Sequence, residues 1–281
     1  MEHAPWRPPA VSGLFYDDDP ERLRRQVRAC YAHPVGPGRQ PAPWGHRQVV
    51  GLVVPHAGFA YSGPVAAHAY LRLSEAAAPE VVVIIGPDHA GRGSAVALAP
   101  QARWQTPLGD VTTDHPVKAA LHRRGIPLDG RGHASEHSVE VQLPFLQMLG
   151  YDGPVLPIVM ARQDLETAMV LAEALAASLA GLKATLIAST DLSHYLPHVR
   201  AVDADRPVLE ALERGDAGGL LGVVERGRIT MCGAGPAAVV LEVGRRLGAT
   251  RRAVLRYATS GETGGSRDSV VGYVAASFEA A

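Results

Sequence analysis

The sequence predicts an α/β fold in one domain, with a central mixed, largely parallel sheet flanked by helices. Short Val- and Ile-rich runs that end at Pro, Gly or Asp alternate along the chain with longer Ala- and Leu-rich runs, as strands alternate with helices in layered α/β proteins. Two apolar runs near the end are joined by a Gly-rich loop, which predicts some antiparallel pairing. The Pro- and Gly-rich residues 33–48 are typical of a surface loop, because the segment before them is too short to bury its own core. We therefore assign residues 1–281 to a single domain.

The first half of the chain begins with an irregular, Pro-rich stretch over residues 1–20. A helix is expected from Asp19 to about Tyr31, because Pro20 suits a first helical turn and the charged side chains share one face. The continuous apolar run Val49–Val54 predicts a buried strand that stops at Pro55. The same rules predict a helix at 64–74, strands at 81–85 and 94–98, a helix at 116–124, and a helix at 136–149 that Pro144 kinks or restarts.

The second half repeats the alternation with longer helices. A strand at Val155–Val159 precedes a long Ala/Leu helix at 164–179, and a strand at Ala184–Ser189 follows. Amphipathic and apolar runs then predict helices at 201–214, 217–225 and 233–247, followed by closing strands at 253–259 and 269–278.

Composition excludes several classes of function. The net charge is −1 and the sequence pI is about 6.9, so there is no basic footprint for nucleic acid or for an anionic membrane. No apolar run approaches the ~20 residues of a membrane span, and the N-terminus lacks the apolar core of a signal peptide. The two cysteines, Cys30 and Cys232, do not make a disulfide framework. We expect a cytoplasmic protein with neither nucleic acid nor membrane as a partner.

Three of the predicted strands are followed by a histidine: His56 in VVPHAG, His89 in IIGPDHAG and His194 in IASTDLSH. The carboxyl ends of parallel strands lie along one edge of a sheet, where α/β proteins place their ligands, so at least two of these imidazoles are expected to converge. Gly58 and Gly63 are interpreted as small residues that let the backbone crowd the same cleft.

Imidazole binds Zn, Cu, Fe and Ni, so the histidines alone do not select a metal. A non-haem Fe(II) site would require two histidines and a carboxylate, and the candidate acids are Asp191, Asp88 and Glu140. His137 and Glu140 stand three residues apart and would share a helix face. This pair either supports the ligands or touches substrate, or it is a solvated surface pair.

The cysteines have different surroundings. Cys232 precedes a Gly-Pro helix start in MCGAGP, where the helix dipole lowers the pKa of a thiol and favours a soft ligand or a nucleophile. A small buried hydrophobe is the alternative. Cys30 lies within an amphipathic helix and is expected to serve in packing.

Six ordered blocks resemble the Memo family, whose bacterial and archaeal members are often labelled AmmeMemoRadiSam system protein B. They are PHAGFAYSG, GPDHAGRG, EHSVEVQLPF, STDLSHY, CGAGP and YATSGETGGSRDSVVGYVA, and with SGLFY they span nearly the whole chain. One departure is Asp17, which stands where the family is expected to have a proline. The resemblance implies a fold similar to that of the class III extradiol ring-cleavage dioxygenases, which use non-haem Fe(II).

By motif, the resemblance implies roles for particular residues. His56 and His89 correspond to the two histidine ligands, and Cys232 to a third ligand where the dioxygenases have a glutamate. His194 corresponds to the catalytic histidine, with Asp191 beside it. The remaining candidates, which would support the ligands or touch substrate, are His137, Glu140 and Asp88. A thiolate ligand is softer than a carboxylate and shifts a site toward Cu(I), Zn or a differently tuned iron, so Fe(II) is the first expectation and Cu or Zn are alternatives.

These observations leave three functions open. The first is a metal-dependent oxidoreductase, dioxygenase-like, with an unidentified substrate. The second is a non-catalytic binding or effector module that takes a small molecule or a peptide into the former active-site cleft. The third, implied by the family label alone, is an accessory protein that acts with a radical-SAM protein and an AMMECR-type protein in one modification system.

Overall fold

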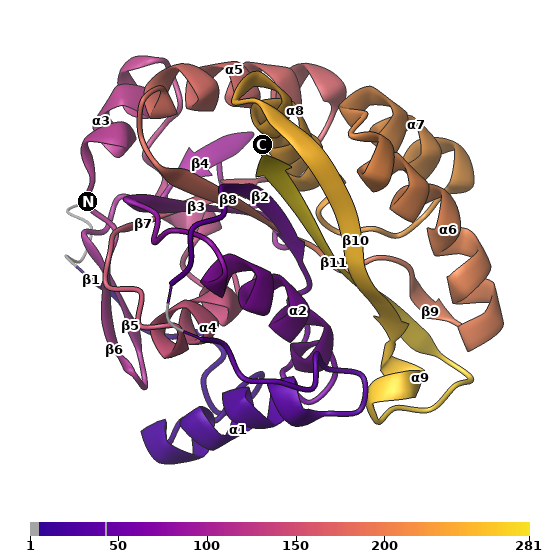
Figure 1. Cartoon of the computed structure of the whole chain (residues 1–281). Helices are drawn as coiled ribbons and strands as arrows, with labels where there is room; N and C mark the ends of the chain where they lie inside the picture. The colour runs from indigo at the N-terminus through magenta and orange to yellow at the C-terminus, as the bar shows by residue number, and fades with distance from the viewer. Residues whose placement is uncertain (1–5, 43) are drawn as a thin grey trace.

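A mixed sheet runs through the middle of the computed structural model, which describes residues 6–42 and 44–281 (Figure 1). In spatial order its main strands are β10 (Ala249–Thr259), β11 (Val270–Ala280), β2 (Val49–Val54), β8 (Ala184–Ser189), β3 (Val81–Pro87), β7 (Val155–Met160) and β4 (Val96–Leu98). The short strand β9 (His194–Leu196) pairs with β11 away from this path.

The centre of the sheet is parallel and its edges are antiparallel. β2, β8, β3 and β7 pair in parallel, whereas β11 and β10 on one side and β4 on the other run antiparallel to their neighbours. The six residues of β2 are all buried, because helices cover both faces of the central strands. A strand that is covered on both faces has a continuous rather than an alternating apolar sequence.

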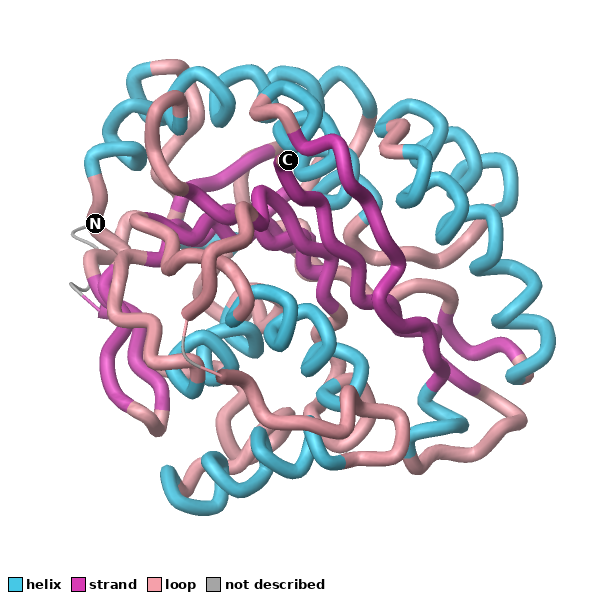
Figure 2. Tube along the Cα trace, viewed as in Figure 1, coloured by secondary structure: helices cyan, strands magenta, loops and turns pink. Residues whose placement is uncertain are grey.

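Helices form a layer on each face of the sheet, so that strands cross the middle of the molecule between two groups of helices (Figure 2). One layer contains α3 (Pro116–Arg123), α5 (Leu165–Leu179), α6 (His198–Arg214), α7 (Ala217–Gly227) and α8 (Ala234–Arg246). The other contains α1 (Pro20–Ala32), α2 (Gly63–Ser74) and α4 (Leu143–Met148). In the described part of the chain, none of these helices has both the length and the apolar character that crossing a bilayer requires.

The predicted fold class is confirmed: the protein is a single layered α/β structure with helices flanking a mixed sheet. Several short polar elements were not predicted. They are a small sheet of β1 (Trp6–Arg7), β5 (Arg103–Thr106) and β6 (Gly109–Thr112), together with β9, the 3₁₀ turn η1 (Gly130–Gly132) and the one-turn helix α9 (Ser260–Thr263).

The helix expected at 136–149 is wrong in its first part. Helical structure begins only with the 3₁₀ turn η2 (Glu140–Gln142), which α4 continues. The N–H groups of His137 and Ser138 instead donate to the carboxylate of Glu136 at 2.9 and 2.8 Å. A short-range side-chain acceptor competes with helical hydrogen bonding in this way. Pro144 lies in the first turn of α4, so it starts that helix rather than kinking a longer one.

Candidate metal centre

Three residues from separate parts of the chain meet at the carboxyl edge of the parallel strands. His56 and His89 each lie two residues beyond a strand, β2 and β3, and Cys232 lies two residues before α8. One donor atom from each of the three lies within 4.8 Å of the other two. The imidazole rings of His56 and His89 are nearly perpendicular, with centroids 5.3 Å apart. The expected convergence of at least two histidines is therefore present.

The hydroxyl of Ser189, the last residue of β8, determines which nitrogen of His56 carries the proton. Ser189 Oγ donates its only proton to the Ser138 carbonyl (2.6 Å) and accepts from Gln142 Nε2 (2.8 Å). Its contact with His56 Nδ1 at 2.9 Å must then be a hydrogen bond that the imidazole donates. Burial, followed by the neighbouring histidines, holds the pKa of His56 well below its ordinary value. The ring is thus neutral, and its Nε2 presents a lone pair toward Cys232.

His89 is oriented by a carboxylate in the same manner. Its Nδ1 lies 2.9 Å and 3.1 Å from the two oxygens of Glu136, and its backbone N–H donates to the same carboxylate at 2.8 Å. Burial opposes the charge of Glu136, but the hydrogen bonds from His89 and Ser138 outweigh it and hold the pKa of this carboxyl far below its ordinary value. An ionised carboxylate only accepts, so Nδ1 donates and Nε2 is left to bind an ion.

The sulfur of Cys232 completes the group. Sγ lies 3.2 Å from His56 Nε2 and accepts the backbone N–H of Asp191 at 3.1 Å. Burial, with the Asp191 carboxylate second, raises the pKa of this thiol. A cation bound at the sulfur reverses that balance, since coordination deprotonates a thiol outright. The position of the sulfur, 3.2 Å from an imidazole nitrogen, favours the ligand interpretation of Cys232 over that of an inert hydrophobe.

The donor set fits a transition-metal ion. Metal–nitrogen and metal–sulfur distances of about 2.0 and 2.3 Å at a tetrahedral angle separate the two donors by roughly 3.5 Å. The observed separation of 3.2 Å between Cys232 Sγ and His56 Nε2 is close to that value. Two neutral imidazoles and one thiolate suit Zn, Cu and Fe, and do not suit the oxygen-preferring Mg²⁺ or Ca²⁺.

Asp191 and His194 lie beside this group. Asp191 is buried, its Oδ1 accepts the His56 backbone N–H at 2.8 Å, and burial raises its pKa to about 6. His194 is the first residue of β9, five residues beyond β8, and is half-buried. Its Nδ1 donates to the Thr230 carbonyl at 2.9 Å, because a carbonyl only accepts. This bond occupies Nδ1, so Nε2 is the ring nitrogen left for proton transfer.

The other three sequence candidates have separate positions. His137 stacks on His89 with centroids 4.6 Å apart and lies 5.3 Å from the ring of His56. Glu140 does not share a helix face with it: its carboxylate is fully buried and binds Arg7, Tyr16 and two backbone N–H groups of the N-terminal segment. Asp88 accepts the N–H groups of Ala90 and Gly93 and so shapes the loop that carries His89.

Four residues that orient the proposed ligands and His194 were not predicted: Glu136, Ser189, Gln142 and Thr230. Glu136 adjoins His137 in a quoted block, and Ser189 ends a predicted strand, so position along the chain was the only available signal. Gly58 lies near the centre, against Phe15, but Gly63 does not. A Cβ at position 63 would meet Cys30 Sγ at 2.4 Å, so Gly63 allows α1 and α2 to pack closely, and the buried Cys30 is confirmed as a packing residue.

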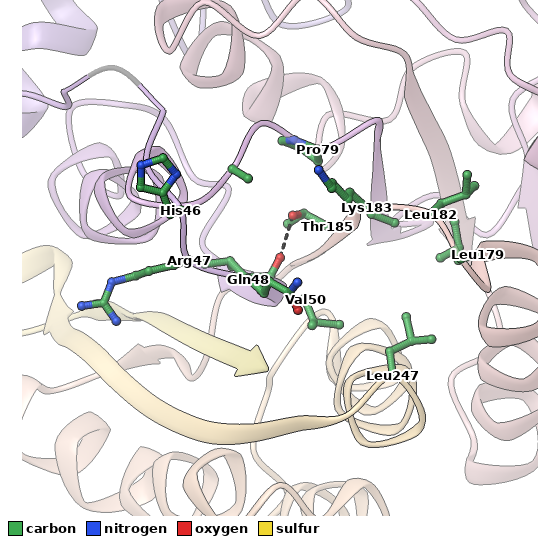
Figure 3. Close-up of a pocket in the computed structure, with 14 residues that line it drawn as sticks. His46, Arg47, Gln48, Val50, Pro79, Leu179, Leu182, Lys183, Thr185 and Leu247 are labelled. Atoms are coloured by element: carbon green, nitrogen blue, oxygen red, sulfur yellow. Dashed lines mark hydrogen bonds between the residues drawn. The ribbon is translucent and has the colours of Figure 1, made fainter. Parts of the chain in front are cut away.

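A cavity of about 390 Å³ lies at the other end of the parallel strands. Figure 3 shows its lining, in which Val50 comes from the start of β2, Gln48 immediately precedes that strand, and Thr185 comes from the start of β8. Thr185 Oγ1 donates to the Val49 carbonyl at 2.7 Å. Because the candidate ligands follow the opposite ends of these strands, this cavity takes no part in the centre described above.

Comparison with known proteins finds one matching family profile and relatives that are similar over nearly their whole length. A sequence profile described as Memo-like protein matches residues 7–277. MEMO1 family protein MK0963 of Methanopyrus kandleri is 45% identical over 278 residues, covering 97% of this chain and 98% of the relative. MEMO1 family protein MTH_45 of Methanothermobacter thermautotrophicus is 44% identical over 271 residues, covering 95% and 98%. A MEMO1 family protein of Sulfolobus acidocaldarius is 42% identical over 281 residues, covering 97% and 99%.

Proposed function

We propose that this chain, which belongs to the Memo-like protein family, binds one transition-metal ion through His56, His89 and Cys232 and uses it in an oxidoreductase reaction. The observation that supports the proposal most is the convergence of these three donors within 4.8 Å. Further support comes from two hydrogen bonds, in which Nδ1 of His56 donates to Ser189 and Nδ1 of His89 donates to Glu136, so that Nε2 of each ring is left for the ion.

Each residue has a definite task in this proposal. His56 Nε2, His89 Nε2 and Cys232 Sγ hold the ion, which for the redox reaction is Fe(II) by first expectation and Cu as the alternative. Zn, which has no redox chemistry, would fit the same donors but would support binding alone. A bound iron or copper ion would supply one-electron chemistry. His194 Nε2 accepts a proton from the substrate while the Thr230 carbonyl keeps the ring in position. Asp191 fixes the His56 backbone, and its raised pKa makes it a second proton acceptor close to the ligands.

Metal titration tests the binding step. Wild-type protein is reconstituted anaerobically with Fe(II), Cu(I) or Zn(II), and the stoichiometry is measured after gel filtration. We expect one ion per chain, lost in His56→Ala and in Cys232→Ser. Cys30→Ala is the matched control, because it removes the other cysteine at a buried packing position and should bind one ion. Full metal occupancy in Cys232→Ser and His56→Ala would contradict the proposal.

Oxygen consumption tests the redox step. The metal-loaded protein is screened with catechols and other reductants, and each active compound is repeated with His194→Gln. We expect turnover in the wild type and a loss of about 10²–10⁴-fold in the variant, the contribution typical of a general acid or base. A fully metallated wild-type protein that is inactive across the screen would instead favour the non-catalytic binding module.

A further inference from the structure

A second cavity, of about 430 Å³, lies beside His194. It is formed by β9, by α6 and by the loop that follows α7, and His194 and Thr230 are part of its lining. The same loop continues to Cys232, so one short stretch of chain contributes to both the cavity and the metal centre. A small molecule in this cavity would therefore contact the residue that the proposed function assigns to proton transfer.

The charges that line the cavity are unbalanced. Arg200 on α6 and Arg228 after α7 both line it, and both are exposed. Within the described ranges neither guanidinium has a carboxylate within 4.0 Å. The one acid in the lining, Asp203, is paired with Arg206 at 2.7 Å. Two unpaired guanidinium groups around a concave space favour an anion that offers several acceptor oxygens.

The backbone at this cavity is also unusual. Over residues 6–42 and 44–281, the only residues other than glycine with positive φ are Tyr195 (61°) and Arg228 (49°). Arg228 lines the cavity, and Tyr195 lies between His194 and Leu196, which also line it. Side chains in the left-handed region are uncommon, and such positions concentrate at functional sites. This conformation holds the Arg228 side chain at a position where a helix end would ordinarily carry glycine.

We propose that this cavity binds the carboxylate or phosphate group of a small molecule through Arg200 and Arg228 and thereby places that molecule against His194. The link to His194 rests on the proposed function, whereas anion binding itself requires no metal. The substrate class follows from the chemistry of the site: a small anionic molecule whose charged end is held by the guanidinium groups.

Anion titration of the metal-free protein tests the proposal. Inorganic phosphate and benzoate are titrated separately at constant ionic strength, and binding is followed by calorimetry and by the NMR signals of the His194 ring. We expect saturable binding of at least one anion, and the stronger of the two identifies phosphate or carboxylate as the preferred group. The double variant R200Q/R228N should bind about tenfold more weakly or worse. Asparagine is used at position 228 because it tolerates positive φ.

Two controls separate this result from general effects. R226Q removes an exposed arginine of α7 that does not line the cavity, and its affinity should stay within about twofold of the wild type. His56→Ala should retain anion binding, so failure of the metal proposal and failure of this one are distinguishable. Absence of saturable binding by either anion, or equal binding by the wild type and R200Q/R228N with unchanged thermal unfolding, would overturn the inference.

Discussion

At the scale of single residues, hydrogen bonds behind the proposed ligands determine what those ligands can do. Ser189 Oγ donates its only proton to the Ser138 carbonyl, so its hydrogen bond with His56 must be donated by Nδ1 of the imidazole. Glu136 has the same effect on His89. Partners of this kind raise the basicity of a metal-binding imidazole and fix the direction of its lone pair.

Replacing Ser189 with alanine should weaken metal binding without abolishing it. The imidazole of His56 loses its acceptor and is free to adopt either tautomer, which is expected to cost about 10- to 100-fold in affinity. Competition with a chelator of known affinity measures the change. Ser178→Ala on α5 is the matched control, because its hydroxyl has no hydrogen-bond partner among residues 6–42 and 44–281 and its loss should leave affinity unchanged. Equal affinities in wild type and Ser189→Ala would show that the hydroxyl does not orient the ligand.

The pair of His89 and Glu136 predicts a pH dependence of stability in the metal-free protein. The depressed pKa of Glu136 gives stability that is present above its unfolded value, about 4.3, and is lost as pH falls through the lower folded value. Burial opposes the charge on His89, but Glu136 outweighs it and raises the pKa of His89. Its contribution is complete below about pH 6.5 and is lost as pH rises through the folded value. The pair thus contributes most to the stability of the folded protein between about pH 4.3 and 6.5.

Denaturant unfolding of wild type and Glu136→Gln across this range checks the prediction. The difference in unfolding free energy between the two proteins should be largest between about pH 4.3 and 6.5 and should narrow on both sides. A difference that is constant from acid to neutral pH would mean that the pair does not titrate as described.

At the scale of elements, α1 and α2 approach closely because position 63 has no side chain. Gly63→Ala should destabilise the protein by about 1–3 kcal/mol, since its new methyl group would overlap Cys30 Sγ. In Gly63→Ala/Cys30→Ala the nearest atom of residue 30 is Cβ, 3.5 Å away, which is an ordinary contact. The double variant should therefore lose less than the sum of the single variants in denaturant unfolding. If the losses of unfolding free energy in the two single variants simply add in the double variant, the strain in Gly63→Ala does not arise from contact with Cys30 Sγ.

Elements that are long, apolar and buried were predictable from the sequence, and short polar ones were not. β2 and β8 have the bounds that the sequence predicts, because their residues are covered on both faces and have no polar alternation to confuse the assignment. β5 and β6 consist of RWQT and GDVT, which carry no run of apolar residues. The segment after Glu136 has a helical pattern, yet a single carboxylate captures its N–H groups.

The candidate site was predictable to a similar degree. Strand ends indicated that at least two of His56, His89 and His194 converge, because parallel strands present their carboxyl ends together. The choice of His56 and His89 among them depended on the family resemblance. The choice of Cys232 as the third ligand depended on the family resemblance, since a thiol at a helix start is compatible with packing as well. Ser189, Gln142 and Thr230 act through hydrogen bonds between segments distant in sequence, and no local pattern marks such partners.

At the scale of the whole molecule, Arg7 links the N-terminal segment to residues 133–140, more than 120 positions away in the sequence. Its guanidinium donates to Glu140 at 2.7 Å and to the His133 carbonyl at 2.6 Å, and it lies 4.1 Å above the ring of Trp104. Both members of the Arg7–Glu140 ion pair are almost completely buried. Arg7 also donates to the carbonyl of Glu136. The same arginine therefore helps to position the residue whose carboxylate orients His89.

Removing the cation should be costly because the carboxylate stays buried. Arg7→Met keeps apolar bulk above Trp104 but leaves Glu140 without its counter-charge, and it should lower the unfolding free energy by about 3–5 kcal/mol. Adding Glu140→Gln removes the unpaired buried carboxylate and should restore part of the lost unfolding free energy. Thermal or denaturant unfolding of both variants measures this. A loss within the ~0.5 kcal/mol of ordinary surface substitutions would contradict the assignment of a stabilising buried pair.

The position of β11 has a consequence for the order of events during synthesis. This strand comes far later in the sequence than β2, yet it lies between β10 and β2 inside the sheet. β2, which leads directly to His56, therefore keeps one unpaired edge until Val270–Ala280 has been translated. Chains normally fold from the N-terminus as they emerge, and long-range strand pairing is slow. The two histidine donors are thus translated early, but β2 gains its second sheet neighbour only after β11 has emerged, so we expect metal binding to follow the translation of Val270–Ala280.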